Sequence, residues 1–461
     1  MQKPVYYLAS ALFFSLINDK IFTIRLIKIY NKEVTIMMKM KRNSLFLILT
    51  ISLLLSITLS SCNRQDDNNI IETNDIAQEA QSEIQHDFSP SPEPTASPQP
   101  TPTPEPVPTQ VTIAMVGDIL LHDPVQESGK MEDGTYNYNH LFANVKEVIQ
   151  DKDLAIVNQE VILGGREIGL SWYPTFNGAY EIADALADTG FNVVLHATNH
   201  TLDKGKIGVE NCINYWETTY PEIAVLGINK SQEDQDNNIY VYEKDDIKIA
   251  ILNYTYGTNG ILLPKDMPYI VNLLDRDKIE ADVIKAKELA DFIILAPHWG
   301  TEYQHSQSRE QEDLAYFMAD LGVDLVIGTH PHVVQPVKWI ESENGNKMLV
   351  YYSIGNFVNS TVRRGNDVTQ RMVGALAEIT VEKNEGEEAF ISDYSARPVI
   401  SHKDTSAPGQ FTVYFAEDYS EELAFQNEIV DQDPSFTFEL CMDIWNKVYP
   451  KFSKCIKVIW D

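Results

Sequence analysis

The sequence predicts an α/β domain in which β-sheets are flanked by helices, and two observations support this fold class. From Val111 onward, short apolar runs typical of buried strands alternate with amphipathic stretches typical of helices. Several of the apolar runs are followed at once by Asp, Glu, Asn or His. Because ligands in α/β folds bind beyond the carboxyl ends of the strands, we expect these polar residues to meet in one site.

The predicted elements follow one another along residues 111–400, which we take as one domain. Strands that precede a polar motif are expected over 111–116, 154–157, 191–195, 292–296 and 323–327. Helices are expected over 139–150, 180–189, 206–219, 276–289 and 308–321. Further strands alternate less with helices, which predicts a second, partly antiparallel sheet, over 239–242, 247–254, 348–352 and 372–381.

Residues 1–110 are expected to lie outside this domain. Residues 40–62 combine a basic start, an apolar run and a small-residue site before Cys62, which is the pattern of a secretory signal. The ending Leu59-Ser60-Ser61-Cys62 resembles a bacterial lipobox, which implies cleavage before Cys62 and a lipid on its sulfur. A plain signal peptide or a membrane helix is the alternative. We therefore expect a lipid anchor at the extracellular face of the cell membrane.

The segments on either side of this signal are interpreted from composition. Residues 1–39 are an N-terminal extension of uncertain origin, and Met37, Met38 and Met40 are alternative starts. Residues 62–110 are polar and then rich in Pro, Ser and Thr, which predicts a disordered tether. Residues 401–461 form an acidic extension with a predicted helix over 437–448.

Net charge and cysteines limit the possible partners. The formal net charge is −31, which disfavours binding to nucleic acid or to anionic lipid head groups. Cys212 is expected to be a buried apolar residue within a helix. Cys441 and Cys455 flank one amphipathic stretch, and the sequence leaves open whether they pair.

The first polar motif is Gly117-Asp118, directly after the strand 111–116. Asp118 is a candidate metal ligand because its carboxylate would point from a strand end into the cleft, and capping of the next helix is the alternative. His122 reaches the same ion if residues 119–122 make one turn.

The next two strands are followed by carboxylate, amide and imidazole groups. Glu160 can bridge two divalent ions, with a solvated loop glutamate as the alternative. Asn199 offers an amide oxygen as a ligand, and His200 beside it can protonate a leaving group or hold an oxyanion. Asp203 is a further catalytic candidate, with helix capping as the alternative.

Three histidines follow the last two motif strands. His298 comes after 292–296, and His330 and His332 share the loop 328–332, where Pro331 favours a turn by fixing its own φ. The combined set predicts a site for two divalent ions. We assign Asp118, Glu160 and His332 to one ion, with His122 as a further candidate, and Glu160, Asn199, His298 and His330 to the other. Mixed nitrogen and oxygen ligands favour Mn, Fe or Zn over Ca or Mg.

In this order, the motifs resemble those of the calcineurin-like metallophosphoesterase superfamily. They resemble more closely its capsule-synthesis branch, the CapA/PgsA-type proteins of poly-γ-glutamate production. The resemblance covers roughly residues 111–400 and rests on the segments 116–118, 158–160, 199–203, 298–303, 328–332 and 353–358. It implies a four-layer α/β/β/α sandwich with a dinuclear metal site, in a membrane-anchored protein that faces outward.

The chain also departs from the family pattern at three positions. Leu120 stands where the superfamily has the His of an Asp-x-His motif, and Glu160 stands where it has a bridging Asp. Thr198 stands where the branch commonly has another Asn. His122 is the candidate substitute for the histidine missing at Leu120, and Glu160 in place of the bridging Asp is shared with the capsule-synthesis branch.

Three functions are consistent with these features. The first is a surface-anchored accessory factor in the synthesis or export of an anionic capsule polymer such as poly-γ-glutamate, with a membrane synthase complex as a partner. The second is a metal-dependent phosphoesterase acting on cell-envelope phosphodiesters. The third is a binding module that keeps the fold without catalysis.

Overall fold

The structure is a computed structural model that describes residues 108–452 apart from 238, 362–363, 366 and 407–410. The predicted signal, Cys62, the tether up to residue 107 and Cys455 lie outside the described residues. No helix among the described residues is long and apolar enough to cross a membrane.

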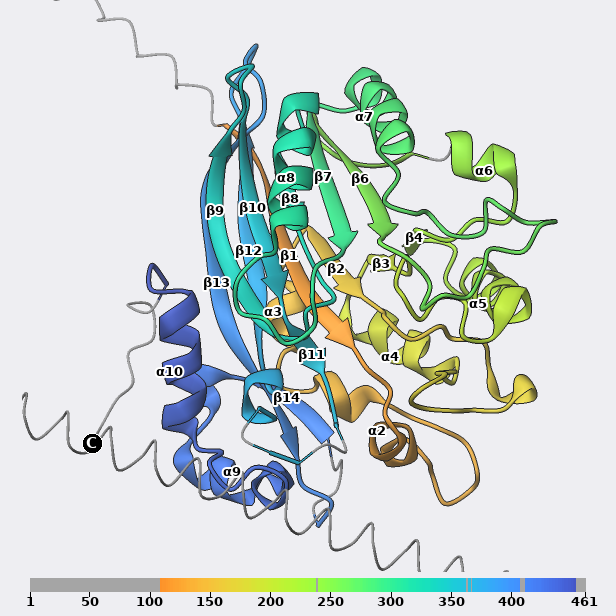
Figure 1. The fold of residues 1–461 in the computed structure, drawn as a ribbon, viewed down its shortest axis with the longest axis vertical. Helices are drawn as coiled ribbons and strands as arrows, with labels where there is room; N and C mark the ends of the chain where they lie inside the picture. The colour runs from red at the N-terminus through yellow and green to blue at the C-terminus, as the bar shows by residue number, and fades with distance from the viewer. Residues whose placement is uncertain (1–107, 238, 362–363, 366, 407–410, 453–461) are drawn as a thin grey trace, which may run out of the picture. The chain divides into compact units, whose positions relative to one another are not determined.

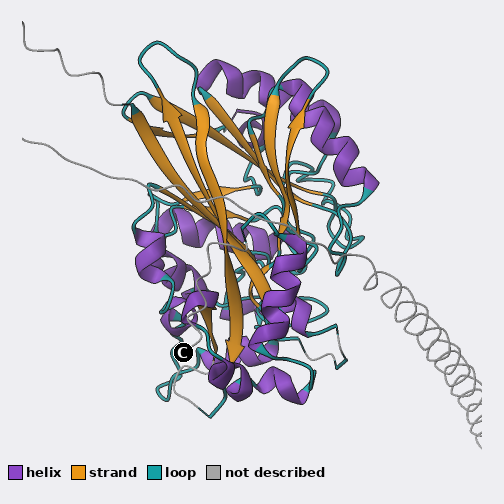
Figure 2. Cartoon of the chain, turned by 90° about the vertical axis from the view of Figure 1, so that its left-hand side faces the viewer, coloured by secondary structure: helices purple, strands orange, loops and turns teal. Residues whose placement is uncertain are grey.

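Two mixed β-sheets form the centre of the domain (Figures 1 and 2). The strand order of the first sheet is β14 (Phe411–Phe415), β13 (Phe390–Lys403), β12 (Val373–Lys383), β1 (Thr109–Ile119), β2 (Leu154–Asn158), β3 (Val193–Leu195) and β4 (Ala224–Leu226), with β11 (Asn356–Val358) paired to the end of β1. The strand order of the second sheet is β5 (Tyr240–Lys244), β6 (Ile247–Thr255), β7 (Phe292–His298), β8 (Leu325–Ile327), β10 (Lys347–Ile354) and β9 (Val334–Glu341).

The five motif strands are divided between the two sheets. Strands β1, β2 and β3 are parallel neighbours in the first sheet, and β7 and β8 are parallel neighbours in the second. The second sheet is partly antiparallel, as expected, because β5 and β9 pair antiparallel at its edges. The prediction that 372–381 belongs to that sheet is wrong: residues 373–381 lie in β12, antiparallel to β1. An apolar strand pattern does not specify its pairing partner.

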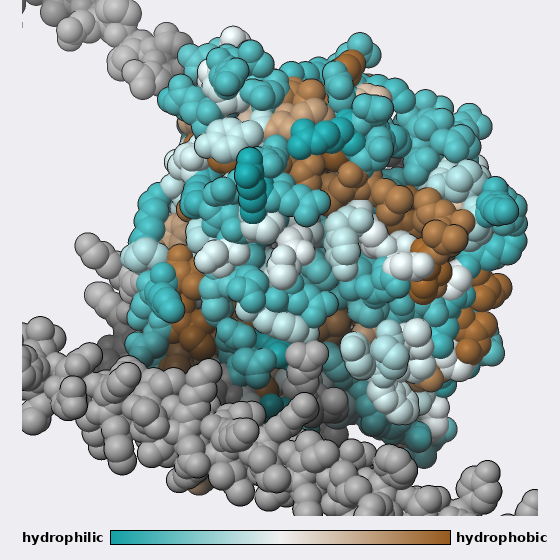
Figure 3. Space-filling view, viewed as in Figure 1, coloured by the Kyte–Doolittle hydropathy of each residue, from teal (hydrophilic) through white to brown (hydrophobic). Residues whose placement is uncertain are grey.

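Three clusters of buried hydrophobic side chains separate four layers. One cluster lies between the sheets and contains Ile113 and Met115 of β1 together with Ile294 of β7. Because successive strand residues point to opposite faces, Val116 belongs instead to the cluster beneath the helices of the first sheet. A third cluster packs two helices on the second sheet. The domain is therefore the predicted α/β/β/α sandwich. Hydrophilic residues cover most of the outer face that Figure 3 shows.

Helices cover the outer faces of both sheets, close to the predicted positions. The first sheet carries α3 (Lys146–Gln150), α4 (Glu181–Thr189) and α5 (Gly205–Thr219), and the second carries α7 (Arg276–Leu289) and α8 (Arg309–Leu321). The side chains of Asp275 and Ser308 cap α7 and α8 by accepting backbone N–H bonds. The helix expected over 139–150 is interrupted, and splits into η1 (Asn139–Phe142) and α3.

The shorter helical segments lie in connections and in the C-terminal part of the chain. They are α2 (Asp123–Ser128), η2 (Arg166–Ile168), α6 (Gln232–Asn237), η3 (Thr369–Arg371), η4 (Ala416–Asp418), α9 (Glu421–Gln426) and η5 (Glu428–Asp431).

The C-terminal part of the chain belongs to the same core. Strand β13 passes through residue 400, where we placed the domain boundary, and β14 pairs with it. The predicted C-terminal helix is confirmed as α10 (Phe438–Val448). It contributes Trp445 and Cys441, which is a free cysteine, to the cluster between the sheets. The segment is therefore packed on the sandwich wherever the structure describes it.

A close backbone approach fixes the end of β1. The N–H of Asp118 donates to the carbonyl oxygen of Gly355, at 3.1 Å. A Cβ atom on Gly117 would lie 1.8 Å from that same oxygen, so this crossing of the two backbone segments requires glycine. Gly355 itself has φ of 67°, which also favours glycine. This crossing determines where the Asp118 carboxylate is placed.

We expect Gly117→Ala to destabilise the domain by about 1–3 kcal/mol or more, because the added methyl forces β1 away from Gly355. Chemical denaturation followed by circular dichroism measures the change. Gly257→Ala is the matched control, since a Cβ there meets no atom within 4 Å. Equal stabilities for the two variants would show that the crossing does not constrain the fold.

Candidate metal centre

The motif side chains converge at the carboxyl ends of strands from both sheets, as the sequence predicts. Asp118, Glu160 and His332 place one potential ligand atom each within 4.8 Å of one another. His332 also belongs to a second such group, with Glu302 and His330. The first sheet supplies Asp118 and Glu160, and the loop after β8 supplies both histidines. The described residues thus contain two adjacent candidate groups that share one histidine.

Asp118 is buried and held by hydrogen bonds on both carboxylate oxygens. Its Oδ1 accepts from Asn158 Nδ2 at 2.8 Å, and its Oδ2 lies 3.0 Å from His332 Nδ1. The N–H of His330 also donates to Oδ2, at 3.3 Å. Asn356 Oδ1 lies 3.1 Å from the same His332 Nδ1. Both neighbours are acceptors, which indicates that Nδ1 carries a proton and leaves Nε2 for a ligand.

Glu160 carries the clearest signature of a cation site. Its two carboxylate oxygens are buried and have no hydrogen-bond partner among the described residues. Burial raises the pKa of Glu160 well above its ordinary value, although the charge of His332 acts to lower this pKa. The His332 Nε2 lies 3.7 Å from Glu160 Oε1. A buried carboxylate without a donor is costly unless a cation compensates it, so a divalent ion fits these residues.

The protonation of His332 shows the same excess of negative charge. Burial alone would lower the pKa of this imidazole, but the carboxylates of Glu160 and Asp118 raise it to about 9. The protonated His332 ring therefore supplies a positive charge next to Asp118 and Glu160. Metal binding releases such a proton, because a ligand nitrogen must be deprotonated.

His298 and His330 form the histidine-rich side of the site. Their ring centroids are 4.8 Å apart, and His298 Nε2 lies 2.9 Å from Asn199 Oδ1. The other ring nitrogen of His298, Nδ1, lies 2.9 Å from Thr329 Oγ1. His330 Nδ1 is buried without a partner among the described residues. Burial lowers the pKa of both histidines well below the ordinary value, so both are neutral, as metal ligation requires.

The backbone of the loop after β8 is strained. His330 has φ of 95° and His332 has φ of 58°, and both values lie in the left-handed region that non-glycine residues rarely adopt. Each such residue costs of the order of 1–3 kcal/mol, and such strain clusters at functional sites. This backbone brings both imidazoles to the carboxylates, an arrangement that the sequence alone did not specify.

His200 and Asp203 form a hydrogen-bonded pair at the edge of the site. His200 Nδ1 lies 2.7 Å from Asp203 Oδ2, and its Nε2 lies 3.9 Å from Glu160 Oε1. Asp203 Oδ2 also accepts from the N–H of Phe176, and α5 has no side-chain cap. The helix-cap alternative for Asp203 is therefore wrong. The carboxylate instead orients His200 with Nε2 towards the cleft.

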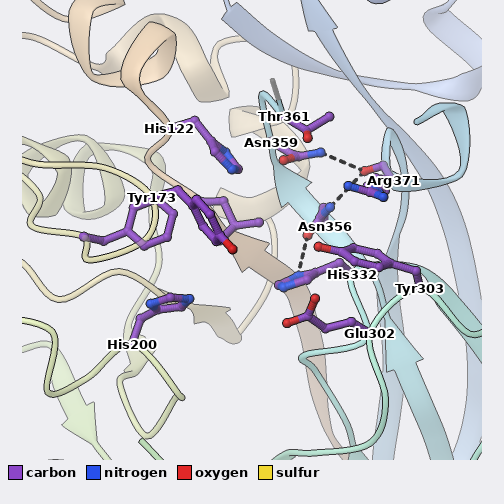
Figure 4. A pocket seen from close by; sticks show the side chains of 12 residues that line it. His122, Tyr173, His200, Glu302, Tyr303, His332, Asn356, Asn359, Thr361 and Arg371 are labelled. Atoms are coloured by element: carbon purple, nitrogen blue, oxygen red, sulfur yellow. Dashed lines mark hydrogen bonds between the residues drawn. The ribbon is translucent and has the colours of Figure 1, made fainter. Parts of the chain in front are cut away.

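His122 lies apart from both groups of potential ligands. It occupies the N-cap position of α2, and its Nδ1 is 3.4 Å from the N–H of Ser360. Burial lowers its pKa to about 3, so the imidazole is neutral. His122 lines the cavity beside the site together with His200 and His332 (Figure 4). Its role as a metal ligand stays a prediction.

The structure brings to the site residues to which the sequence assigned no role. Glu302 joins one ligand group, and Tyr303, Asn356 and Arg371 line a cavity of about 130 Å³ beside it (Figure 4). A signal existed for Glu302 and Tyr303, because they directly follow the His298 motif, and for Asn356, because it follows a strand. No signal existed for Arg371, which is distant in sequence from every motif.

Residues 112–361 match the model of a family described as "Bacterial capsule synthesis protein PGA_cap", which is more than half of the 461-residue chain. The chain belongs to this family. The matched segment contains every candidate ligand from Asp118 to His332 and ends before Arg371. The fold is the four-layer α/β/β/α sandwich that the sequence resemblance implied.

Two relatives give the family match its context. The PGA biosynthesis protein CapA of Bacillus subtilis (strain 168) is 29% identical over 229 residues, which cover 50% of this chain and 56% of that protein. The capsule biosynthesis protein CapA of Bacillus anthracis is 28% identical over 264 residues, covering 54% and 60%. This chain therefore spans less than two thirds of the length of either relative.

Solved structures of lower similarity include the NAD nucleotidase NadN of Haemophilus influenzae, with a TM-score of 0.39, 12% identity and coverage of 75% of this chain and 68% of that one. A putative 5′-nucleotidase from Staphylococcus aureus has a TM-score of 0.36 and 14% identity, covering 62% and 54%. Neither similarity bears on the function of this family member.

We expect Glu160→Gln to lose bound divalent metal, because a neutral amide cannot balance or bridge cations as a carboxylate does. Elemental analysis of the full chain after Mn²⁺ loading and desalting measures the metal content. Glu127→Gln is the control, since the Glu127 side chain is 59% exposed and belongs to neither group of potential ligands. Undiminished metal content would contradict the assignment.

Proposed function

We propose that this family member supports the synthesis or export of an anionic capsule polymer such as poly-γ-glutamate, through a dinuclear metal site. The family match carries the proposal, because it encloses the whole set of candidate ligands. The printed names of two relatives refer to PGA and capsule biosynthesis, and they are 29% and 28% identical to this chain. Since the chain covers only part of each, its role in the same process is our inference.

The residues suited to two ions are those around the buried carboxylates. Asp118, Glu160 and His332 suit one ion, and the second has Glu160 as a shared ligand with three others, Asn199, His298 and His330. Glu302 is an added candidate, because it lies with His330 and His332. Two divalent ions, which we expect to be Mn, Fe or Zn, would bind the oxygens of a substrate and polarise the bond to be cleaved.

His200 is placed to move a proton. Asp203 accepts from Nδ1, which leaves Nε2 of the neutral ring as a base or, when protonated, as an acid. The edge contact of Phe176, with ring centroids 4.7 Å apart, holds the imidazole in this orientation. We assign His200 the proton transfer to a leaving group and Asp203 the orientation of its ring.

We further propose that the chain acts at the extracellular face of the cell membrane, anchored by a lipid on Cys62. The sequence of residues 40–62 supports this location, and the run 89–109 supports a tether between anchor and domain. A membrane synthase complex is the expected protein partner. The net charge of −31 disfavours nucleic acid as a partner.

Deletion of the gene in its own bacterium should reduce the surface polymer, because the accessory factor would be missing. Capsule staining and quantification of the purified polymer measure the effect. The wild-type chain and Glu127→Gln should restore the polymer, whereas Glu160→Gln should not. Unchanged polymer after deletion would contradict the capsule role.

The pair of His200 and Asp203 specifically favours a second candidate, a metal-dependent phosphodiesterase of the cell envelope. The full chain loaded with Mn²⁺ should then hydrolyse bis-p-nitrophenyl phosphate, and His200→Gln should reduce kcat by about 10²–10⁴-fold while the metal content is kept. His140→Gln is the control, because His140 contacts Ser128 away from the site. Metal-loaded wild-type chain without turnover would reject the hydrolase and favour a binding module.

A further inference from the structure

A buried arginine lines the cavity beside the candidate metal ligands. Arg371 ends the short helix η3 and is 3% exposed. Among the residues that line the same cavity are Glu302 and His332, which belong to the candidate metal centre (Figure 4). Arg371 lies outside the segment matched by the family model, which ends at residue 361. The family match therefore says nothing of its role, and only its contacts in the structure indicate one.

The guanidinium is held in place by contacts on two sides. Its Nη2 donates to Asp367 Oδ2 at 2.6 Å, and its central carbon lies 3.7 Å from the centroid of the Tyr303 ring. The Tyr303 ring in turn lies 5.9 Å from that of His332. Tyr303 has φ of 62°, a strained backbone conformation that sets its ring between the arginine and the metal ligand. The cation is thus pre-organised next to the metal centre.

One donor of this guanidinium lacks a partner. Arg371 Nε is buried and forms no hydrogen bond within the described part of the chain. A buried charged donor left without an acceptor costs at least about 1–3 kcal/mol, and native proteins rarely contain one without a reason. The ion pair with Asp367 does not satisfy this N–H, because Asp367 bonds to Nη2. The contacts of the described residues therefore leave this cation incompletely compensated beside the cavity.

Two neighbouring amides in the cavity wall are not free to bind a ligand. The amide nitrogens of Asn356 and Asn359 are already engaged, since both donate to the carbonyl oxygen of Arg371, at 2.9 and 3.4 Å. The volume of about 130 Å³ admits a small group and excludes a folded segment of polymer. Tyr173 and Phe176 add an aromatic wall suited to the aliphatic part of a ligand.

We propose that this cavity is a subsite for an oxyanion of the substrate, a carboxylate or a phosphate, bound by the guanidinium of Arg371. Both groups present oxygens that match guanidinium donors. The inference rests on the proposed function in one respect, namely that the substrate occupies the adjacent metal centre. The carboxylate would come from a glutamyl unit, and the phosphate from a cell-envelope ester.

Calorimetric titration of the full, metal-loaded chain with glutarate and with methylphosphonate tests the subsite. We expect the wild-type chain to bind at least one probe, and Arg371→Gln to bind it at least about tenfold more weakly with unchanged metal content. Arg309→Gln, whose side chain is 92% exposed, is the control and should bind as the wild type does. The probe whose affinity falls identifies the source of the oxyanion.

Two results would overturn the proposal: no binding of either probe to the wild-type chain, or equal affinities in Arg371→Gln. Circular dichroism checks that this variant folds. If it does not, Asp367→Asn decides, because the Asp367 side chain is 51% exposed and its removal frees Nη2 for the anion. Severalfold tighter binding in Asp367→Asn supports the subsite, and unchanged or weaker binding rejects it.

The capsule role and the subsite fail separately. Normal polymer in the deletion strain, together with anion binding that depends on Arg371, would reject the capsule role and keep the subsite. Reduced polymer together with equal affinities in Arg371→Gln would reject the subsite and keep the capsule role.

Discussion

The attraction between acids of one sheet and histidines of the other is the interaction on which the site depends. Asp118 and Glu160 follow strands of the first sheet, and His330 and His332 follow β8 of the second. The group of Asp118, Glu160 and His332 needs both sheets, whereas Glu302, His330 and His332 all follow strands of the second sheet. Because the pKa of His332 is raised to about 9, its protonated ring attracts the acids of the first sheet. A divalent ion bound there would displace this proton and attract the acids more strongly. The sandwich therefore positions the site, and the site in turn joins the two strand ends.

The strained backbone around the site follows from this requirement. Tyr303, His330 and His332 adopt left-handed conformations, with φ between 58° and 95°. Residues two apart in an extended strand point to the same face, so alternation of faces does not explain these turns; the left-handed φ values of His330 and His332 instead mark where the chain bends after β8. The three hydrophobic clusters anchor the strands next to these loops, and their stabilising free energy offsets the strain of the turned backbone. The rigid core thus allows the strained loops to keep their conformation.

The sequence predicted the site better than it predicted the sheets. Asp118, Glu160 and His332 were identifiable because a polar residue directly after an apolar strand is a local signal. The partner of β12 was not, because pairing with β1 joins segments more than two hundred residues apart. The contribution of β13, β14 and α10 to the core was missed for the same reason, and the boundary at residue 400 falls inside a strand. Arg371 is the extreme case, since its proximity to His332 arises only from the fold.

The charge of the chain bears on how such a site would meet an anionic polymer. A net charge of −31 repels a polyanion at a distance, but screening limits this repulsion to about 8 Å at physiological salt. Within the cavity the nearest charges decide, and there Arg371 and bound metal ions would provide the positive ones. An acidic surface is therefore compatible with a substrate that meets positive charge inside the cavity.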